Sequence, residues 1–156
     1  TLGTGYADST DSILTQQKGY QSEIKVLCKW METYPDNVCS LTHGFPWRSF
    51  IADDQIKLPD WVWDPFMGQN CNMEVCFPVR IGDIFEYPYQ AVWAPLEQMV
   101  NKIGSSNLLW GTDMPFQNRF CTYTQSRTWI EKHCDFLDNN DTEMIMGGTA
   151  QRILSI

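Results

Sequence analysis

Residues 108–116 of this sequence, LLWGTDMPF, are the stretch that decides the fold. The apolar Leu-Leu-Trp at its start is typical of a buried strand, and the Gly-Thr-Asp and Pro that follow are typical of a tight turn. The stretch therefore predicts a short strand that carries a carboxylate, Asp113, at its carboxyl end.

Helical and strand-like patterns alternate on both sides of this stretch. Apolar residues at spacings of three and four predict helices, and short apolar runs predict strands. Because neighbouring parallel strands need helical crossovers between them, this alternation predicts an α/β fold with a parallel sheet. The expected helices are 21–34, 91–100, 122–136 and 140–146, and the expected strands are 38–42, 73–78 and 107–113.

Residues that favour caps and turns set the expected boundaries. Asn140 or Asp141 is expected to begin the last helix, and Gly147-Gly148 to end it. Residues 1–12 have the composition of a loop. The Trp- and Pro-rich segment 46–72 sustains no period, so it predicts no more than one short helix.

Composition and charge limit the function classes. At 156 residues, 43% hydrophobic and 19% charged, the chain has the size and composition of one core-forming domain. Its net charge of −8 with scattered basic residues opposes binding to a phosphate backbone, and no apolar run approaches the ~20 residues of a membrane span. We therefore expect neither nucleic acid nor a membrane among its partners.

The six cysteines indicate free thiols rather than a disulfide framework. No two of them have the Cys-x-x-Cys spacing of a zinc or redox site, so we expect buried thiols in a reducing cytosol. Cys71 and Cys76 would form a bridge only in an oxidising compartment. The predicted location is cytoplasmic.

Three ionisable residues fall at the carboxyl ends of the predicted strands. His43 follows the first strand, Glu74 lies on the second and Asp113 ends the third. Reactive side chains of parallel sheets lie at these ends, so the three are expected to converge on one rim. Each has a structural alternative: Asp113 as a turn or helix cap, His43 as a hydrogen-bonded scaffold residue, and Glu74 as an ion-pair partner of Arg80.

Three parts of the chain resemble the amidohydrolase-related family, metal-dependent hydrolases and decarboxylases built on a (β/α)8 barrel. Residues 108–116 are similar to the last barrel strand of that family, and residues 34–44 are similar to its Phe-Pro-Asp, strand, His-Gly pattern. Residues 147–154, GGTAQRIL, resemble its closing Gly-Asn-Ala-x-Arg-Leu segment, with Thr149 in place of Asn. The likeness covers nearly the whole chain and is strongest over 74–154.

The resemblance implies that the chain is the C-terminal half of a (β/α)8 TIM barrel. Such families open with a His-x-His pair that supplies two metal ligands, and this chain contains only His43 and His133. A complete barrel has about 250 residues. We therefore expect residues 1–156 to form about three to four βα units of such a barrel. The N-terminal half would lie upstream or on another chain, or would have been lost.

The resemblance also implies roles for individual residues. Asp113 is expected to be a catalytic residue that ligates a divalent metal, zinc above all, or takes a proton from the attacking water. His43 is expected to be the second catalytic residue, because an imidazole with a pKa of about 6.5 gives or takes a proton at neutral pH. A metal is not obligatory, since some relatives look able to work without one.

Two further residues are expected to bind substrate, and one histidine is not. Glu74 would be a third polar group at the rim, and Arg119 would clamp a substrate carboxylate, with a surface ion pair as its structural alternative. His133, near the end of a polar helix, is expected to be a solvated or helix-end cation.

The sequence thus predicts a hydrolase or decarboxylase that acts on a small carbonyl or carboxylate compound. Two alternatives stay open: a non-catalytic half-barrel subunit that serves assembly or ligand binding, and a complete small α/β binding domain of another family. A half-barrel would have unpaired strand edges and an uncovered apolar face. We therefore also expect an oligomer, in which the chain associates tightly with its missing half or with a second copy of itself.

Overall fold

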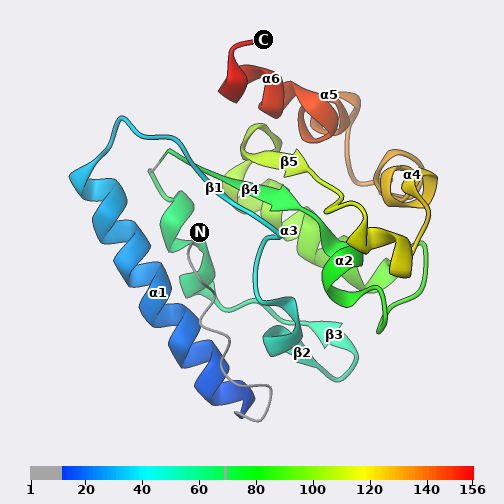
Figure 1. Cartoon of the computed structure of the whole chain (residues 1–156), viewed down its shortest axis with the longest axis horizontal. Helices are drawn as coiled ribbons and strands as arrows, with labels where there is room; N and C mark the ends of the chain where they lie inside the picture. Colours follow the sequence, from blue (N-terminus) through cyan, green and yellow to red (C-terminus); the bar gives the residue numbers. More distant parts are fainter. Residues whose placement is uncertain (1–11, 69) are drawn as a thin grey trace.

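The structure, a computed structural model that describes residues 12–68 and 70–156, is built on a three-stranded parallel sheet (Figure 1). Its strands, in their order across the sheet, are β1 (Cys39–Leu41), β4 (Cys71–Val75) and β5 (Leu108–Trp110). Leu41 lies opposite Met73, and Met73 lies opposite Leu108. The expected alternation of helices with parallel strands is confirmed, and the architecture is that of an α/β fold.

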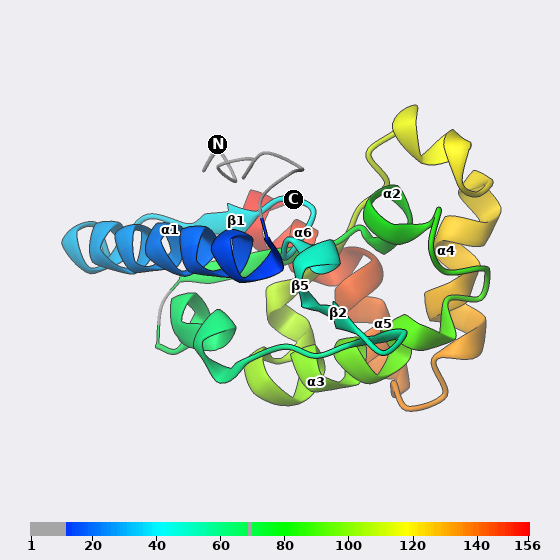
Figure 2. The ribbon, with the colours of Figure 1, turned by 90° about the horizontal axis from the view of Figure 1, so that it is seen from below.

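Helices connect the strands and cover them. They are α1 (Ile13–Thr33), α2 (Phe77–Ile81), α3 (Trp93–Ile103), α4 (Tyr123–His133), α5 (Asn139–Glu143) and α6 (Thr149–Leu154). Both views place α1 beside β1 and α4 at the opposite end of the molecule (Figure 1, Figure 2). Helix α6 returns to pack against β5. None of the helices in the described ranges has the length and hydrophobicity to span a bilayer.

The segment 46–72 contains more regular structure than the sequence predicts. Its strands β2 (Ile51–Ala52) and β3 (Gln55–Ile56) pair antiparallel, and Asp53 and Asp54 between them have φ angles of 54° and 57°. Positive φ at both central residues is the geometry of a type I′ hairpin turn. Short helical turns complete the fold: η1 (Trp47–Phe50), η2 (Asp60–Phe66), η3 (Gln90–Val92), η4 (Ser105–Asn107), η5 (Phe116–Arg119) and the π-type η6 (Met144–Gly148).

Strand β4 is the centre of the core. All of its residues except Glu74 are buried, as expected for the central strand of a parallel sheet covered on both faces. Phe77, directly beyond this strand, packs its ring against Trp47 and Trp129, with ring centroids 4.3 and 5.8 Å away. The side chain of Glu74 is partly exposed and is therefore available at the carboxyl end of the sheet.

Two helices begin earlier than the sequence predicts because polar side chains cap them. Ser12 accepts a hydrogen bond from the backbone N–H of Thr15 and starts α1, well before the expected residue 21. Asp138, rather than Asn140 or Asp141, accepts the hydrogen bond that starts α5. The expected loop at residues 1–12 lies outside the described residues except for Ser12.

Of two further expected element ends, the strand end is wrong and the helix end is a kink. Phe77 and Pro78 open α2 instead of closing the strand, because proline suits the first helical turn, where no N–H is needed. The expected helix end at Gly147-Gly148 is where the helical backbone breaks, because Gly147 has a φ of 179° and a ψ of −31°, and helical structure resumes beyond this kink in α6 (Thr149–Leu154).

All six cysteines are free thiols in the structure. Cys71 begins β4 and Cys76 follows its end, which separates their Cα atoms by about 16 Å at the usual strand rise. A disulfide needs Cα atoms within about 7 Å, so the bridge considered from the sequence is wrong for this fold. Burial raises the pKa of Cys71 and of Cys134 to about 12, which keeps both thiols protonated at neutral pH.

Candidate active site

The imidazole of His43 and the carboxylate of Asp113 meet at the carboxyl end of the sheet. His43 follows β1 and Asp113 follows β5, on either side of the central strand. Nε2 of His43 lies 3.2 Å from Oδ2 of Asp113, and the two side chains are 28% and 32% exposed. The pair is therefore in hydrogen-bond contact and still accessible to a small molecule.

The backbone at both residues is left-handed. The φ angle is 63° at His43 and 51° at Asp113. For a residue with a Cβ this conformation costs roughly 1–2 kcal/mol, and such residues cluster at functional sites. Local bonds hold both turns: Trp47 Nε1 donates to the carbonyl of His43 at 3.0 Å, and the backbone N–H of Phe116 donates to the carbonyl of Asp113 at 2.9 Å.

Glu74, on the central strand, contacts the segments that follow both neighbouring strands. Its Oε2 accepts a hydrogen bond of 2.6 Å from the backbone N–H of His43. Its Oε1 lies so close to Gly111 that a Cβ built on this glycine would stand 1.8 Å from it. Only glycine permits this approach, so Glu74 links the turn after β1 to the end of β5 across the central strand.

Arg80, on α2, is a rim residue that the sequence reasoning did not assign to the site. Its Nη2 lies 2.7 Å from Nδ1 of His43, on the side of the ring opposite Asp113. The considered pairing of Glu74 with Arg80 is not what the structure has, because Glu74 bonds to the backbone of His43 and Arg80 bonds to its ring. Its place in the sequence could have identified it as a site residue. Arg80 lies just beyond the carboxyl end of β4, and the functional loops of such sheets lie at that end.

A second arginine fixes the segment that carries Arg80. Arg48 Nε donates to the carbonyl of Arg80 at 3.1 Å, and Arg48 Nη2 pairs with Asp83. The hydrogen bond from Arg48 holds the pKa of the Asp83 carboxyl below its usual value. These contacts attach α2 to η1 and so position the guanidinium of Arg80.

Cys76 is an uncharged neighbour of this rim. Burial raises the pKa of its thiol, and the carboxylates of Glu74 and Asp113 raise it further. A thiol that resists ionisation is a poor nucleophile, so Cys76 is not a candidate nucleophile of this rim.

Two other predicted residues lie elsewhere. The exposed guanidinium of Arg119 stacks 5.4 Å from the ring centroid of Phe116, and the structure does not join it to the His43–Asp113 pair. His133 lies in the last turn of α4, at the helix end that the sequence predicts. It is half-buried rather than solvated, its Nε2 lies 3.0 Å from the hydroxyl of Tyr87, and its ring stacks on Trp93.

The described residues do not fit a complete metal centre. Zinc in proteins has four ligands, at least three of them from the protein. His43 and Asp113 offer two donor types that zinc accepts, but Glu74, the next carboxylate, is bonded to the His43 backbone. Within residues 12–68 and 70–156, no group of three or more His, Cys, Asp or Glu side chains is placed to hold a metal ion.

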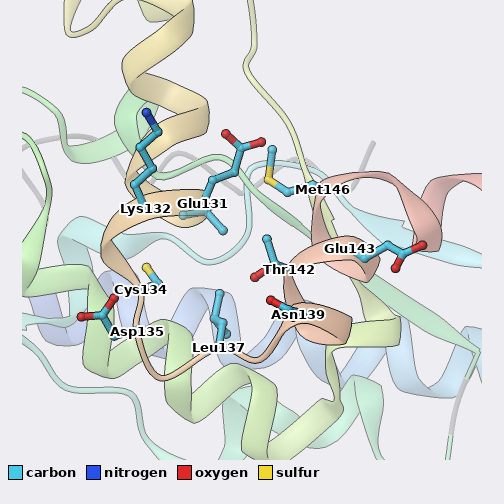
Figure 3. A pocket seen from close by; sticks show the side chains of 10 residues that line it. Glu131, Lys132, Cys134, Asp135, Leu137, Asn139, Thr142, Glu143 and Met146 are labelled. Atoms are coloured by element: carbon cyan, nitrogen blue, oxygen red, sulfur yellow. The ribbon is translucent and has the colours of Figure 1, made fainter.

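A cavity of about 520 Å³ lies apart from this rim, between the end of α4 and α5 (Figure 3). Thr142 and Leu137 lie at its middle, and Lys132, Asp135 and Glu143 extend away from one another around it. None of His43, Glu74, Arg80 or Asp113 lines it. The cavity is therefore not part of the candidate site.

One comparison with known proteins gives a match. A family model described as Amidohydrolase matches residues 18–156, which is most of the chain and includes every residue of the rim. No curated protein and no solved structure matches the chain.

Proposed function

This chain belongs to the amidohydrolase family, and from that premise we propose that its reaction takes place at the rim where His43 and Asp113 meet. The family supports a hydrolase-type function. The 3.2 Å contact between Nε2 of His43 and Oδ2 of Asp113 is the observation that carries the proposal to these residues. An acid–base pair at adjacent strand ends, open to a small molecule, is the arrangement that proton transfer in hydrolysis requires.

We infer that the substrate is a small carbonyl or carboxylate compound and that the reaction is its hydrolysis or decarboxylation. Asp113, as an ionised carboxylate, would take the proton from the attacking water. His43 would polarise the substrate or move a proton through its ring. Glu74 would hold the turn that carries His43. Arg119, at the end of η5 and exposed, would contact a substrate carboxylate.

We propose a divalent metal, zinc first, as the cofactor of the complete protein. Asp113 would supply one carboxylate ligand from this chain, and the other ligands would come from residues outside the described ranges. A bound metal would supply Lewis-acid chemistry. The proton roles proposed for Asp113 and His43 do not depend on it.

We propose that the chain is the C-terminal half of a TIM barrel that works with an N-terminal half. Support comes from the parallel sheet, in which β1 and β5 each have one neighbour among the described strands, and from the family match over most of the chain. The match to this family speaks against a complete binding domain of another family. Free thiols at all six cysteines support a reducing compartment such as the cytoplasm.

The first test is Asp113→Asn in the complete protein, with Asp135→Asn as the matched control at an exposed position. Asparagine tolerates the left-handed backbone of position 113, so folding is expected to survive. Turnover should fall by about 10²–10⁴-fold, measured as hydrolysis of p-nitrophenyl acetate alongside a panel of small amides and carboxylic acids. The control should keep its rate.

A near wild-type rate in folded Asp113→Asn would contradict the catalytic proposal. It would instead favour the alternative of a non-catalytic half-barrel subunit. Circular dichroism of both variants separates loss of chemistry from loss of fold.

A further inference from the structure

The hydrogen bond between Arg80 and His43 determines where the imidazole carries its proton. A guanidinium has five N–H donors and no acceptor, and it stays charged at all ordinary pH values. Nδ1 of His43, 2.7 Å from Nη2 of Arg80, must therefore be the acceptor and must carry no proton. A neutral imidazole has one N–H, so that proton lies on Nε2.

The other nitrogen has a partner that agrees with this assignment. Nε2 lies 3.2 Å from Oδ2 of Asp113, and an ionised carboxylate only accepts hydrogen bonds. A proton on Nε2 therefore allows a hydrogen bond to Asp113 and leaves Nδ1 free to accept one from Arg80. A proton on Nδ1 would instead face the donors of Arg80, and Nε2 and Oδ2 would then be two acceptors in contact with each other. Both contacts point to one tautomer.

Arg80 is suited to donating a hydrogen bond to His43 because its guanidinium forms no ion pair in the described residues. Among the ion pairs of residues 12–68 and 70–156, none involves Arg80, although Asp113 contacts the imidazole of His43 and Glu74 contacts its backbone. Its backbone carbonyl is held by Arg48, which fixes the start of the side chain. The guanidinium is thus directed to the ring of His43 rather than to a carboxylate.

We propose that Arg80 is a positioning residue that holds the imidazole proton of His43 on Nε2, so that His43 meets Asp113 as a proton donor. In the common catalytic arrangement a carboxylate orients one imidazole nitrogen and leaves the other free to accept a proton. Here both nitrogens are bonded within the chain, and the unprotonated one is covered by Arg80. Asp113 is then the proton acceptor of the pair, and His43 the donor.

The assignment also restricts how His43 relates to a metal. A neutral imidazole that ligates a metal through Nε2 must carry its proton on Nδ1, which is incompatible with the Arg80 hydrogen bond. While Arg80 donates to Nδ1, His43 is not a metal ligand, and Asp113 stays available as one. The proton-donor role rests on the proposed function, whereas the place of the proton rests on the geometry alone.

The test is nitrogen-15 NMR of the imidazoles at a pH of about 8.5, well above the usual imidazole pKa of about 6.5. This chain carries two histidines, His43 and His133, and the ring resonances that disappear in His43→Asn are those of His43. In the wild type, Nε2 of His43 should show the shift of a protonated nitrogen, and Nδ1 the shift of an unprotonated nitrogen that accepts a hydrogen bond.

The variants isolate Arg80. In Arg80→Met, which removes the donors and keeps helix propensity, Nδ1 should move toward the shift of an unbonded nitrogen. Arg80→Lys should restore part of the wild-type value, since it keeps a donor. Arg127→Met, at an exposed arginine of α4, is the matched control and should leave both His43 resonances unchanged.

A proton on Nδ1 in the wild type would overturn the proposal even if no Arg80 variant folds. So would an unchanged Nδ1 resonance in folded Arg80→Met. The measurement does not use activity, so its failure is distinguishable from failure of the proposed function: a fully active Asp113→Asn removes the function and leaves the assignment of the proton standing.

Discussion

Gly111 determines how closely the end of β5 approaches Glu74. A Cβ at this position would stand 1.8 Å from Oε1 and 2.6 Å from Cδ of Glu74, so one of the two must move. If Glu74 moves, the backbone N–H of His43 loses its charged acceptor. Gly111→Ala is therefore expected to lower the free energy of unfolding by about 2–3 kcal/mol.

Urea denaturation measures this loss, and Gly19→Ala is the matched control. Nothing lies within 4 Å of a Cβ built on Gly19, which is inside α1. Alanine there should raise stability by up to about 1 kcal/mol because of its helix propensity. A Gly111→Ala variant as stable as the wild type would show that Glu74 does not depend on the close approach.

At this scale the sequence placed three residues of the rim and missed the fourth. His43, Glu74 and Asp113 were found because each lies at the end of a recognisable apolar run, and parallel strands align their ends. Arg80 was considered only as a partner of Glu74, because no local pattern shows which of two neighbouring groups a long side chain will reach. Whether these residues catalyse a reaction stays a prediction.

Helix α4 shows how much a single cap contributes at the scale of an element. Thr122 and Gln125 form a reciprocal capping box, in which each side chain bonds the backbone N–H of the other. Thr122→Ala should lower the free energy of unfolding by about 1 kcal/mol. Thr124→Ala, at an exposed position in the same helix, should be neutral or slightly stabilising.

Thermal and urea unfolding of these two variants check the expectation. Equal stabilities of Thr122→Ala and Thr124→Ala would mean that α4 is fixed by packing of its buried face, where Trp129 is fully inaccessible, and not by its cap.

Elements with a sustained period were predictable, and those without one were not. The helices α3 and α4 and the three parallel strands were expected close to where they occur. Their sequences show apolar residues at helical spacing or in short continuous runs. The hairpin of β2 and β3 was missed, since two-residue strands show no alternation and Asp53-Asp54 lacks the glycine typical of such turns. The start of α1 was missed because its first turns carry few buried residues.

At the scale of the whole molecule, the sheet leaves strand edges that proteins normally cover. Within the described residues β1 and β5 each pair with β4 on one side only. Exposed apolar side chains lie on α1 at Val26 and Trp30 and at its C-cap residue Tyr34, spaced four residues apart. Unpaired edges and apolar patches promote association.

We therefore expect the isolated 156-residue chain to associate, either with an N-terminal half or with itself. Static light scattering over a range of micromolar concentrations should show a mass above that of the monomer, 18.1 kDa. Val38→Lys, which places a charge next to the β1 edge, should reduce the association. A stable, soluble monomer at all concentrations would contradict this expectation.

The left-handed backbone at His43 and Asp113 opposes stability to the function that we propose for them. Glycine would adopt either conformation without the steric cost that a Cβ brings, so selection for a robust fold alone would favour glycine at both positions. The chain instead keeps an imidazole at one and a carboxylate at the other. Variants chosen only for heat resistance would therefore tend to lose this pair first, and a screen that scores activity together with melting temperature would be needed to retain it.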